Sequence, residues 1–419
     1  MKTLVVSCAW PGPLAESSHG LFRRFDMMAG ALRRVSSSVN ALFFVAPELQ
    51  ERLGSDGAAS AQLSARWDMP VQVQLCARAS LPSPAGPWQS YVLPALNFLR
   101  QEPYAETAGQ AQKVALAQAL ADRPDLLFVH RLRAMPPVLG HQGQLPPTLF
   151  DLDDIEHVSY ARSLTQGPQW RGKRLLQWRL PALRRGEVAA IRRATRTLVC
   201  STEDRESLLK QLPVAPNSVL AVPNAVLLPE PVALTTAPVL MSIGQYAYEP
   251  NRAGIEFFLD QVWPLIHCVR PDATLIVAGP NPQLVRHSAP NLLPKGVTFT
   301  GFVPDLSTLY VGTRVVVCPI QSGSGTRVKL VEAAAWARPI VSTHIGAEGL
   351  GMVDGQHALL RDSPSEMAAA CLQLLSDDAK AQALREAARS LTAACFDRQI
   401  IEQRLADLMS NLAANQLTS

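Results

Sequence analysis

Strand-length apolar runs alternate with helix-length amphipathic segments along almost the whole chain, and they fall into two series. The expected strands of the first series are 3–7, 39–45, 71–76, 126–129, 148–152, 196–200 and 219–222. Those of the second series are 239–244, 274–278, 297–300, 315–319, 340–342 and 358–360. This alternation is typical of parallel sheets covered by helices. The pattern therefore predicts an α/β protein with doubly wound, Rossmann-like sheets.

A proline-rich stretch, 229–238 (PEPVALTTAP), separates the two series and is typical of a linker between domains. We therefore expect an N-terminal Rossmann-like domain over 1–230 and a C-terminal one over 231–395. The segment 396–412 has a helical period and contains no strand. A ligand is expected in a central cleft between two such domains, at the carboxyl ends of the strands.

The composition indicates a folded chain with a mild positive charge. Of 419 residues, 47% are hydrophobic and 18% are charged, which argues against disorder. The formal net charge of +4 suits an anionic small molecule or an anionic membrane surface. It is too weak to indicate a nucleic-acid partner.

The cysteines and the amino terminus favour a cytoplasmic protein. The seven cysteines are scattered and no pair has CxxC spacing, so neither a zinc site nor a disulfide framework is indicated. The first residues, MKTLVVSCAWPGP, are more typical of a buried first strand than of a signal peptide. No stretch approaches the roughly 20 apolar residues of a membrane helix.

A strand, a glycine–serine loop and a helix follow one another in the second half. The strand 314–320 (RVVVCPI) ends just before the loop 323–326 (GSGT), and a helix begins directly afterwards. Backbone N–H groups and the helix dipole favour an anion at such a junction. Arg327 and Lys329 have the wrong charge for the dipole alone, so their presence indicates a polyanion that binds with them.

The spacing of Glu332 extends this interpretation. Glu332 lies five residues beyond Arg327, roughly 7.5 Å along the helix axis, which is about the reach from a diphosphate to the ribose of one nucleotide. The alternative is that the cations are solvated surface charges and that Glu332 is an i,i+3 partner of Lys329. The candidate ligand-binding residues of this segment are Gly323, Ser324, Gly325, Thr326, Arg327, Lys329 and Glu332.

The run 301–350 (GFVPDLSTLYVGTRVVVCPIQSGSGTRVKLVEAAAWARPIVSTHIGAEGL) resembles the donor-site signature of family-4, group 1 glycosyltransferases of the GT-B fold. It is most similar to the subgroup whose donor loop reads GSGTRxKxxEA. The resemblance implies that Arg327 and Lys329 bind the donor diphosphate and Glu332 its ribose, with Gly244 and Val303 also on the donor side. It further implies that the transfer retains the anomeric configuration and needs neither metal nor cofactor.

The same resemblance suggests that the final helix, 396–419, packs back on the first domain. It also implies a bacterial setting in polysaccharide or glycolipid assembly.

Two positions depart from the family pattern. Many family-4 enzymes have Glu-x7-Glu, but counting back from Glu332 places Ser324 where the first carboxylate would stand. Near 244–252 the usual phosphate-binding Arg is replaced by Gln245, and Arg252 is a candidate substitute. We expect Arg327 and Lys329 to supply the charge that those residues provide elsewhere.

His130 ends the apolar run 125–130 (DLLFVH), where a polar side chain faces the ligand side of a parallel sheet. It resembles a histidine that lies beside the transferring sugar in many family-4 enzymes, so it is a candidate catalytic residue. A structural hydrogen-bonding role is the alternative. Arg131 and Arg133 follow and could meet an anionic acceptor.

The first strand is followed by AWPGP, which is not the GxGxxG of a dinucleotide-binding turn. Family members place a small-residue loop here, which makes Gly12, His19 and Gly20 candidates for the acceptor side. An ordinary turn with an exposed histidine is the alternative.

The segment 151–157 (DLDDIEH) contains the Asp-x-Asp spacing that binds a metal in the other large glycosyltransferase fold. It lies far in sequence from the diphosphate loop, and acids at a helix start need no metal. It also resembles an acidic stretch that caps a helix and lines the acceptor side in family-4 proteins. We therefore predict no metal site and assign Asp153 and Glu156 to the acceptor side.

The segment 170–196 is strongly basic, with Trp178 among its arginines. An anionic bilayer would attract such a helix pair, which predicts peripheral contact at the inner face of the plasma membrane. A solvated basic helix face is the alternative, because no clean apolar stripe accompanies the charges.

The sequence thus predicts a glycosyltransferase that moves a sugar from a nucleoside diphosphate to an acceptor hydroxyl of a glycan, glycolipid or polysaccharide precursor. Two alternatives stay open: a sugar-nucleotide epimerase of the same fold, and a catalytically idle nucleotide-sugar-binding protein. The second alternative arises because Ser324 replaces the usual glutamate.

Overall fold

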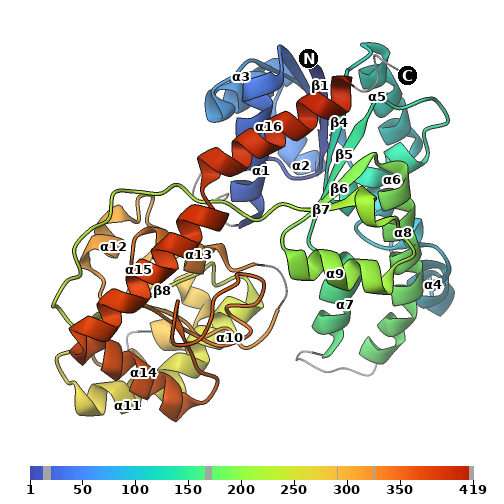
Figure 1. Cartoon of the computed structure of the whole chain (residues 1–419). Coiled ribbons are helices and arrows are strands. Elements are labelled where there is room, and N and C mark those ends of the chain that lie inside the picture. The colour runs from blue at the N-terminus through green and yellow to red at the C-terminus, as the bar shows by residue number, and fades with distance from the viewer. Residues whose placement is uncertain (13–19, 166–171, 290, 324–325, 415–419) are drawn as a thin grey trace. The chain divides into compact units, whose positions relative to one another are not determined.

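The computed structural model describes residues 1–12, 20–165, 172–289, 291–323 and 326–414. The chain divides into two compact units, each built around its own parallel sheet (Figure 1). Unit 1 comprises Met1–Gly12, Leu21–Val222 and the carboxyl-terminal segment from Glu402. Unit 2 comprises Pro223–Ile401 and, among the described residues before it, Gly20.

Unit 1 has a seven-stranded sheet in the order β3-β2-β1-β4-β5-β6-β7. Its strands are β1 Lys2–Ser7, β2 Ser38–Val45, β3 Val71–Ala77, β4 Leu126–His130, β5 Thr148–Asp153, β6 Arg196–Val199 and β7 Val219–Ala221. Its helices are α1 Gly20–Val35, α2 Pro47–Leu53, α3 Asp56–Trp67, α4 Leu93–Leu96, α5 Gln110–Ala121, α6 Met135–Leu139, α7 Glu156–Thr165, α8 Leu180–Arg193 and α9 Thr202–Gln211. Short helical turns are η1 Trp88–Val92, η2 Phe98–Arg100, η3 Ala105–Thr107, η4 Leu132–Ala134, η5 Lys173–Arg179 and η6 Pro216–Ser218.

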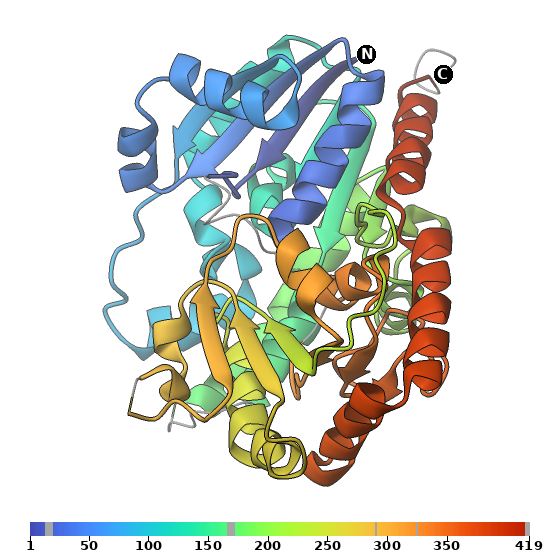
Figure 2. The same ribbon diagram turned by 90° about the vertical axis from the view of Figure 1, so that its left-hand side faces the viewer.

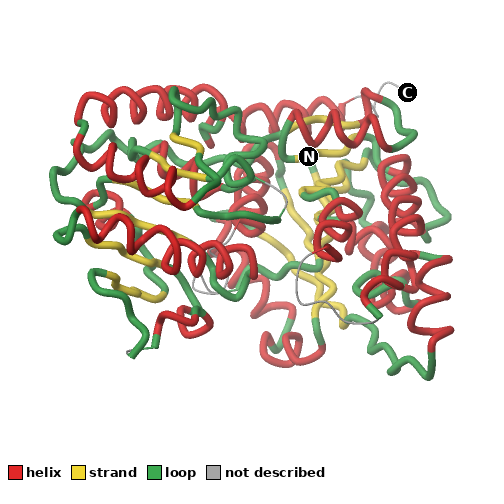
Figure 3. Tube along the Cα trace, turned by 90° about the horizontal axis from the view of Figure 1, so that it is seen from below, coloured by secondary structure: helices red, strands yellow, loops and turns green. Residues whose placement is uncertain are grey.

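The centre of this sheet is apolar because both of its faces are covered by helices (Figure 3). Val5 of β1 pairs with Ala41 on one side and with Phe128 on the other, and all three side chains are buried. The strand order reverses between β1 and β4, since β2 and β3 lie on one side of β1 and β4 to β7 on the other. Side chains at the carboxyl ends of β1 and β4 therefore lie at the switch point where ligands bind in open α/β sheets.

Unit 2 has a six-stranded sheet in the order β10-β9-β8-β11-β12-β13 (Figure 2). Its strands are β8 Val239–Ile243, β9 Thr274–Ala278, β10 Val297–Gly301, β11 Val315–Cys318, β12 Ile340–Ser342 and β13 Leu359–Leu360. Its helices are α10 Glu249–Phe257, α11 Trp263–Val269, α12 Ser307–Gly312, α13 Val328–Ala335, α14 Pro364–Ser376 and α15 Asp378–Cys395, with short turns η7 Phe258–Val262, η8 Pro282–Leu284 and η9 Arg286–Ser288. The switch point of this sheet lies between β8 and β11.

Each strand expected from the apolar runs is present, with ends that differ by about one residue. The two doubly wound, parallel sheets confirm the predicted fold class. The expectation is accurate because both sheets are buried on both faces, so their strands are short apolar runs that stand out in the sequence.

The proline-rich stretch 229–238 differs from the expectation of a linker. The structure changes unit at Val222, and the stretch lies within unit 2. Arg338 donates to the carbonyls of Val232 and Ala233, and Arg314 donates to the carbonyl of Thr235. Proline has no backbone N–H group, so this stretch has few donors for pairing with a strand. Its carbonyl groups can still accept hydrogen bonds, and buried arginines donate to them here.

The last helix, α16 Arg398–Ala414, passes from one unit into the other. Glu402 belongs to unit 1, where its Oε2 lies 3.3 Å from Nη2 of Arg34 on α1. A Cβ atom on Gly30 of α1 would lie 2.1 Å from Oε1 of Glu402, so the helices approach closely at a glycine. Among the described residues, no helix is long and apolar enough to cross a membrane.

Candidate active site

In unit 2 the loop after β11 is held by contacts that only a glycine allows. Gly323 has φ of 103°, which other residues rarely adopt. A Cβ atom here would lie 3.0 Å from the Tyr248 hydroxyl oxygen and 3.3 Å from Nη2 of Arg327. The backbone therefore runs close to both side chains. Ser324 and Gly325, two of the predicted ligand-binding residues, lie outside the described part of the chain.

The helix α13 begins directly after Arg327, whose side chain is buried rather than spread into solvent. Nη2 of Arg327 donates to the carbonyl of Ser322 at 3.4 Å. Glu332 is half-buried on the same helix. The other face of α13 is anchored by apolar residues, including Leu330 and Val331, which are fully buried. Packing of that face fixes the rotation of the helix, and with it the direction of its polar side chains.

Lys329 takes part in a short chain of hydrogen bonds. Its Nζ donates to Oδ1 of Asn251 at 2.7 Å, and Nδ2 of Asn251 donates to the carbonyl of Gln245 at 3.0 Å. Burial, assisted by the neighbouring Arg327, lowers the pKa of Lys329. Arg327 and Lys329 therefore repel one another in a partly buried environment. A bound dianion would offset this electrostatic repulsion.

Sequence reasoning missed Asn251. It pointed to Arg252 in the same segment, but Nη1 of Arg252 donates to the carbonyl of Tyr246 at 3.4 Å. The sequence signal for Asn251 is the helical register of α10, because Asn251 and Arg252 are neighbours in a helix and their side chains point in different directions.

Close backbone approaches bring these elements together. A Cβ atom on Gly254 of α10 would lie 2.7 Å from the carbonyl oxygen of Pro319, which follows β11. A Cβ atom on Gly279 would lie 1.8 Å from the carbonyl oxygen of Gly244, and Gly279 has φ of 135°. Gly244 thus lies at the carboxyl end of β8 within the packed turns, and Val303 lies just beyond β10 in a half-exposed loop.

In unit 1, His130 lies at the carboxyl end of β4 and is completely buried. Its ring stacks on Phe25 with centroids 4.2 Å apart, and its Nδ1 lies 2.9 Å from Oγ of Ser7. Oγ of Ser7 already accepts the Ala9 N–H, so its own proton is available for Nδ1. When Ser7 donates to Nδ1, the histidine proton is on Nε2, which is buried without a hydrogen-bond partner among the described residues.

The electrostatics of His130 exclude a charged imidazole at neutral pH. Burial, with a contribution from Arg131, lowers the pKa of His130 to about 3. A neutral histidine can donate one hydrogen bond from Nε2, but it cannot supply a proton as a general acid at pH 7. The structure thus favours hydrogen-bond donation over acid catalysis as the role of this predicted catalytic residue.

Behind this histidine lies a buried network of opposite charges. Arg24 donates to both carboxylate oxygens of Asp151, and both side chains are fully buried. Asp153 lies 3.5 Å from Arg24 and 3.7 Å from Arg131. Burial opposes the ionisation of Asp153, but Arg131 and Arg24 outweigh it and lower its pKa. Asp151 and Asp153 therefore bind arginines, and of the acids of this stretch Glu156 lies in the first turn of α7.

The backbone at this edge adopts uncommon conformations. Asp153 has φ of 61° and Arg131 has φ of 68°, both in the region that favours glycine. Non-glycine residues persist in such conformations only where the surroundings hold them, and they cluster at functional sites. Here the ion pairs and the pairing of the Arg131 N–H with the Asp151 carbonyl hold them.

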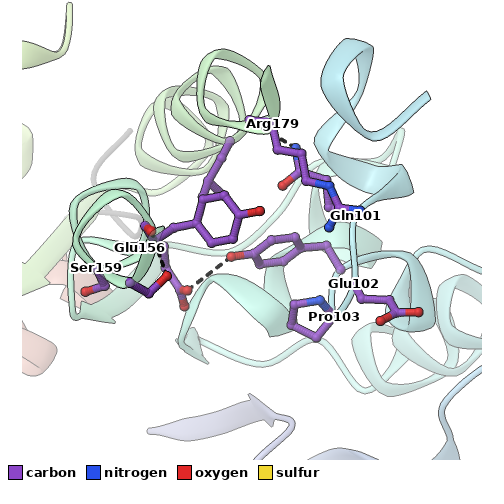
Figure 4. Close-up of a pocket in the computed structure, with 10 residues that line it drawn as sticks. Gln101, Glu102, Pro103, Glu156, Ser159 and Arg179 are labelled. Carbon is purple, nitrogen blue, oxygen red and sulfur yellow. Dashed lines mark hydrogen bonds between the residues drawn. The ribbon is translucent and has the colours of Figure 1, made fainter. Parts of the chain in front are cut away.

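A pocket of about 260 Å³ lies beside this network within unit 1 (Figure 4). Tyr104 donates from its hydroxyl to Oε2 of Glu156 at 3.1 Å, and burial raises the pKa of Glu156. The wall combines aromatic rings with hydroxyl, amide, carboxylate and guanidinium groups. Its lining residues are Gln101, Glu102, Pro103, Tyr104, Glu156, Ser159, Tyr160, Ser163, Arg179 and Leu183. Of the residues expected on the acceptor side, the structure thus places Glu156 in a pocket.

The remaining residues expected on the acceptor side are Gly12, His19 and Gly20. Gly12 lies in the turn after β1, where its carbonyl accepts from Nη1 of Arg66 at 2.9 Å. Gly20 is the first residue of α1, and His19 lies outside the described residues. No group of three or more His, Cys, Asp or Glu side chains in the described ranges is arranged to hold a metal ion.

These features define a class: two Rossmann-like units, one of which presents cations at a glycine loop and helix start. Residues 237–377 match the family model described as glycosyl transferases group 1. No curated protein matches the chain.

Solved structures share the fold across the full length of the chain. Sucrose-phosphate synthase from Thermosynechococcus elongatus is 17% identical, with a TM-score of 0.70 and 99% of each chain covered. HepE from Anabaena, solved with UDP, is 15% identical, with a TM-score of 0.66 over 98% of this chain and 100% of that one. The pneumococcal O-GlcNAc transferase GtfA, solved with UDP and GlcNAc, is 12% identical, with a TM-score of 0.67 over 98% and 99%.

At these identities the likeness establishes the fold, which is the GT-B fold that the sequence predicts. Together with the match in unit 2, it supports a glycosyltransferase.

Proposed function

We propose that this protein transfers a sugar from a nucleoside-diphosphate sugar to an acceptor hydroxyl, with retention and without a metal. The observation that carries the proposal is the pair Arg327 and Lys329 at the start of α13, beside Gly323. Arg327 is buried and Lys329 is half-buried, and burial lowers the pKa of Lys329. A diphosphate would place negative charge beside both cations.

The reaction exchanges one glycosidic bond for another. The bond between the anomeric carbon and the diphosphate oxygen breaks, and a bond from that carbon to the acceptor oxygen forms. The acceptor proton passes to the departing diphosphate on the same face of the sugar, which releases a nucleoside diphosphate. Negative charge grows on the diphosphate in the transition state, where Arg327, Lys329 and the helix N-terminus would stabilise it.

The other residues take supporting roles in this proposal. Glu332 would bind the ribose hydroxyls, and Asn251 would hold the Lys329 ammonium in place. His130 would act as a neutral hydrogen-bond donor to the sugar, because its pKa of about 3 leaves the ring uncharged at pH 7. The pocket around Glu156 and Tyr160 suits a sugar or polyol acceptor, which presents hydroxyls at its edges and apolar C–H faces to aromatic rings.

A thermal-shift screen with UDP-, GDP-, ADP-, dTDP- and CMP-sugars tests the donor site. HepE and GtfA were solved with UDP, so UDP-sugars come first. A ligand at about 100 times its Kd adds about 2.7 kcal/mol to the stability of the folded state. Lys329→Ala should abolish the shift, whereas Lys380→Ala on α15 of the same unit should keep it.

Turnover provides the second readout. Arg327→Ala or Lys329→Ala should each lower kcat by roughly 10²–10³, the scale for one lost anion-stabilising donor. Near-normal turnover in both variants would refute the assigned roles. Epimerised donor without any acceptor, or donor binding without turnover, would instead identify one of the two alternative functions.

A further inference from the structure

Four large apolar side chains are exposed on neighbouring elements of unit 1: Trp88 (61%), Leu96 (63%), Leu175 (36%) and Trp178 (58%). We refer to them as the aromatic face. They come from η1, α4 and η5, which contact one another, and α4 and η5 also contact α8. Nη2 of Arg179 donates to the carbonyl of Ser90 at 2.6 Å, which fixes η5 against η1. In Figure 1 the labelled helices α4 and α8 run side by side.

The geometry of η5 places two of these side chains together. It is a 3₁₀ helix, in which side chains three residues apart are eclipsed, so Leu175 and Trp178 share one side. The basic segment therefore has an apolar stripe after all, although it has the 3₁₀ period rather than the α-helical one. The part of that segment before Gly172 lies outside the described residues.

Exposed arginines accompany the aromatic face. Arg174, Arg184 and Arg185 are exposed, and Nη2 of Arg185 donates to the carbonyl of Leu96 at 3.2 Å. The segments 78–101 and 172–186 contain no Asp or Glu. The acid that follows the first segment, Glu102, is exposed, whereas the one that follows the second, Glu187, is fully buried and contacts His157.

We propose that the aromatic face and Arg174, Arg184 and Arg185 dock this protein on the surface of an anionic lipid bilayer. Tryptophan and leucine side chains enter the interfacial layer, and arginines bind lipid phosphates through paired N–H groups. A second copy of the chain is disfavoured as the occupant, because a two-fold contact would bring these arginines against one another. The inference goes beyond the proposed function and does not depend on it.

Vesicle flotation of the full chain tests the docking surface. The chain should float with vesicles of phosphatidylglycerol and phosphatidylcholine, and not with phosphatidylcholine alone. Arg174→Glu with Arg185→Glu should lower the partition coefficient at least about tenfold, since each basic residue contributes to binding near an anionic surface. The matched control is Arg33→Glu with Arg52→Glu on α1 and α2, which should bind normally.

The apolar contribution has its own pair of variants. Trp88→Gln with Trp178→Gln should weaken binding by a similar factor and remove the blue shift of tryptophan emission that vesicles cause. Leu265→Gln with Val269→Gln removes exposed apolar surface from α11 of unit 2 and should change neither signal.

Three results would overturn the proposal. The first is no flotation with the anionic vesicles, and the second is equal flotation with both kinds. The third is light scattering that shows a dimer in solution which the Trp88 and Trp178 variants abolish. Because no sugar nucleotide enters the assay, its failure leaves the donor site untouched, and loss of donor binding leaves flotation unchanged.

Discussion

At the residue scale, the site depends on polar groups that are held away from water. Lys329 is oriented by Asn251, and His130 by Ser7 and by the ring of Phe25. Each of these partners comes from another element of the same unit, which costs little entropy because the elements are already packed. Asn251, Ser7 and Phe25 thus position the candidate functional side chains without taking part in the proposed chemistry.

Acid should destabilise the protein through His130. Its pKa is about 3 when folded and about 6.5 when unfolded, so the unfolded state binds its proton first as pH falls. The stabilisation is therefore complete above pH 6.5 and is lost progressively toward pH 3. Between pH 7 and pH 5 we expect a loss of about 2 kcal/mol in the free energy of unfolding.

Urea unfolding at several pH values measures this effect. His130→Asn removes the titrating ring, so its free energy of unfolding should fall by about 2 kcal/mol less over the same interval. An exposed histidine provides the control, and His344→Asn should retain the full dependence. Equal slopes for the parent protein and His130→Asn would contradict the assignment.

At the element scale, the carboxyl edge of the second sheet is assembled from turns that touch through their backbones. The N–H of Gly244 donates to the Ala278 carbonyl, and the N–H of Gly279 donates to the Gly301 carbonyl. These bonds join the turns after β8, β9 and β10 into one layer. The layer carries the start of α10, and with it the residue that binds Lys329.

Two glycines of this layer make a matched pair for mutation. Gly279→Ala would place Cβ 1.8 Å from the Gly244 oxygen at φ of 135°, so it should destabilise unit 2 by about 3 kcal/mol or more. Gly301→Ala, at φ of 70° with open space around its Cβ, should cost only about 1 kcal/mol. Chemical denaturation compares the two, and equal costs would show that the close approach is not what constrains Gly279.

At the scale of the whole molecule, each unit has its own sheet and its own apolar core. The proposed donor contacts all come from unit 2, and the buried network and pocket come from unit 1. Separate cores allow a ligand to stabilise one unit before the other.

Hydrogen exchange with a nucleoside diphosphate alone should reveal this division. We expect slower exchange in the segments 244–257 and 326–336 of unit 2, because binding lowers their opening. The Lys329→Ala protein under the same conditions serves as the reference and should show no protection. Protection confined to unit 1 would place the nucleotide elsewhere and refute the proposed donor site.

Much of the fold could be predicted because local patterns encode it. The apolar runs marked the strands of both sheets, and the strand–loop–helix at 314–333 marked the cationic site. These features can be recognised in the sequence because a strand that is buried on both faces must be apolar, and because a phosphate-binding loop needs small residues. They did not reveal Asn251, which differs from any other surface asparagine only through its tertiary neighbours.

The sequence by itself therefore determined the class of fold, the strands and the position of the cationic loop, all of which depend on residues close together along the chain. The tertiary structure alone decided which side chains meet across long separations. It paired Arg24 with Asp151, buried His130 against Phe25, fixed the proline-rich stretch to unit 2, and gathered the aromatic face from three elements. These outcomes depend on packing and desolvation, which only a folded chain creates.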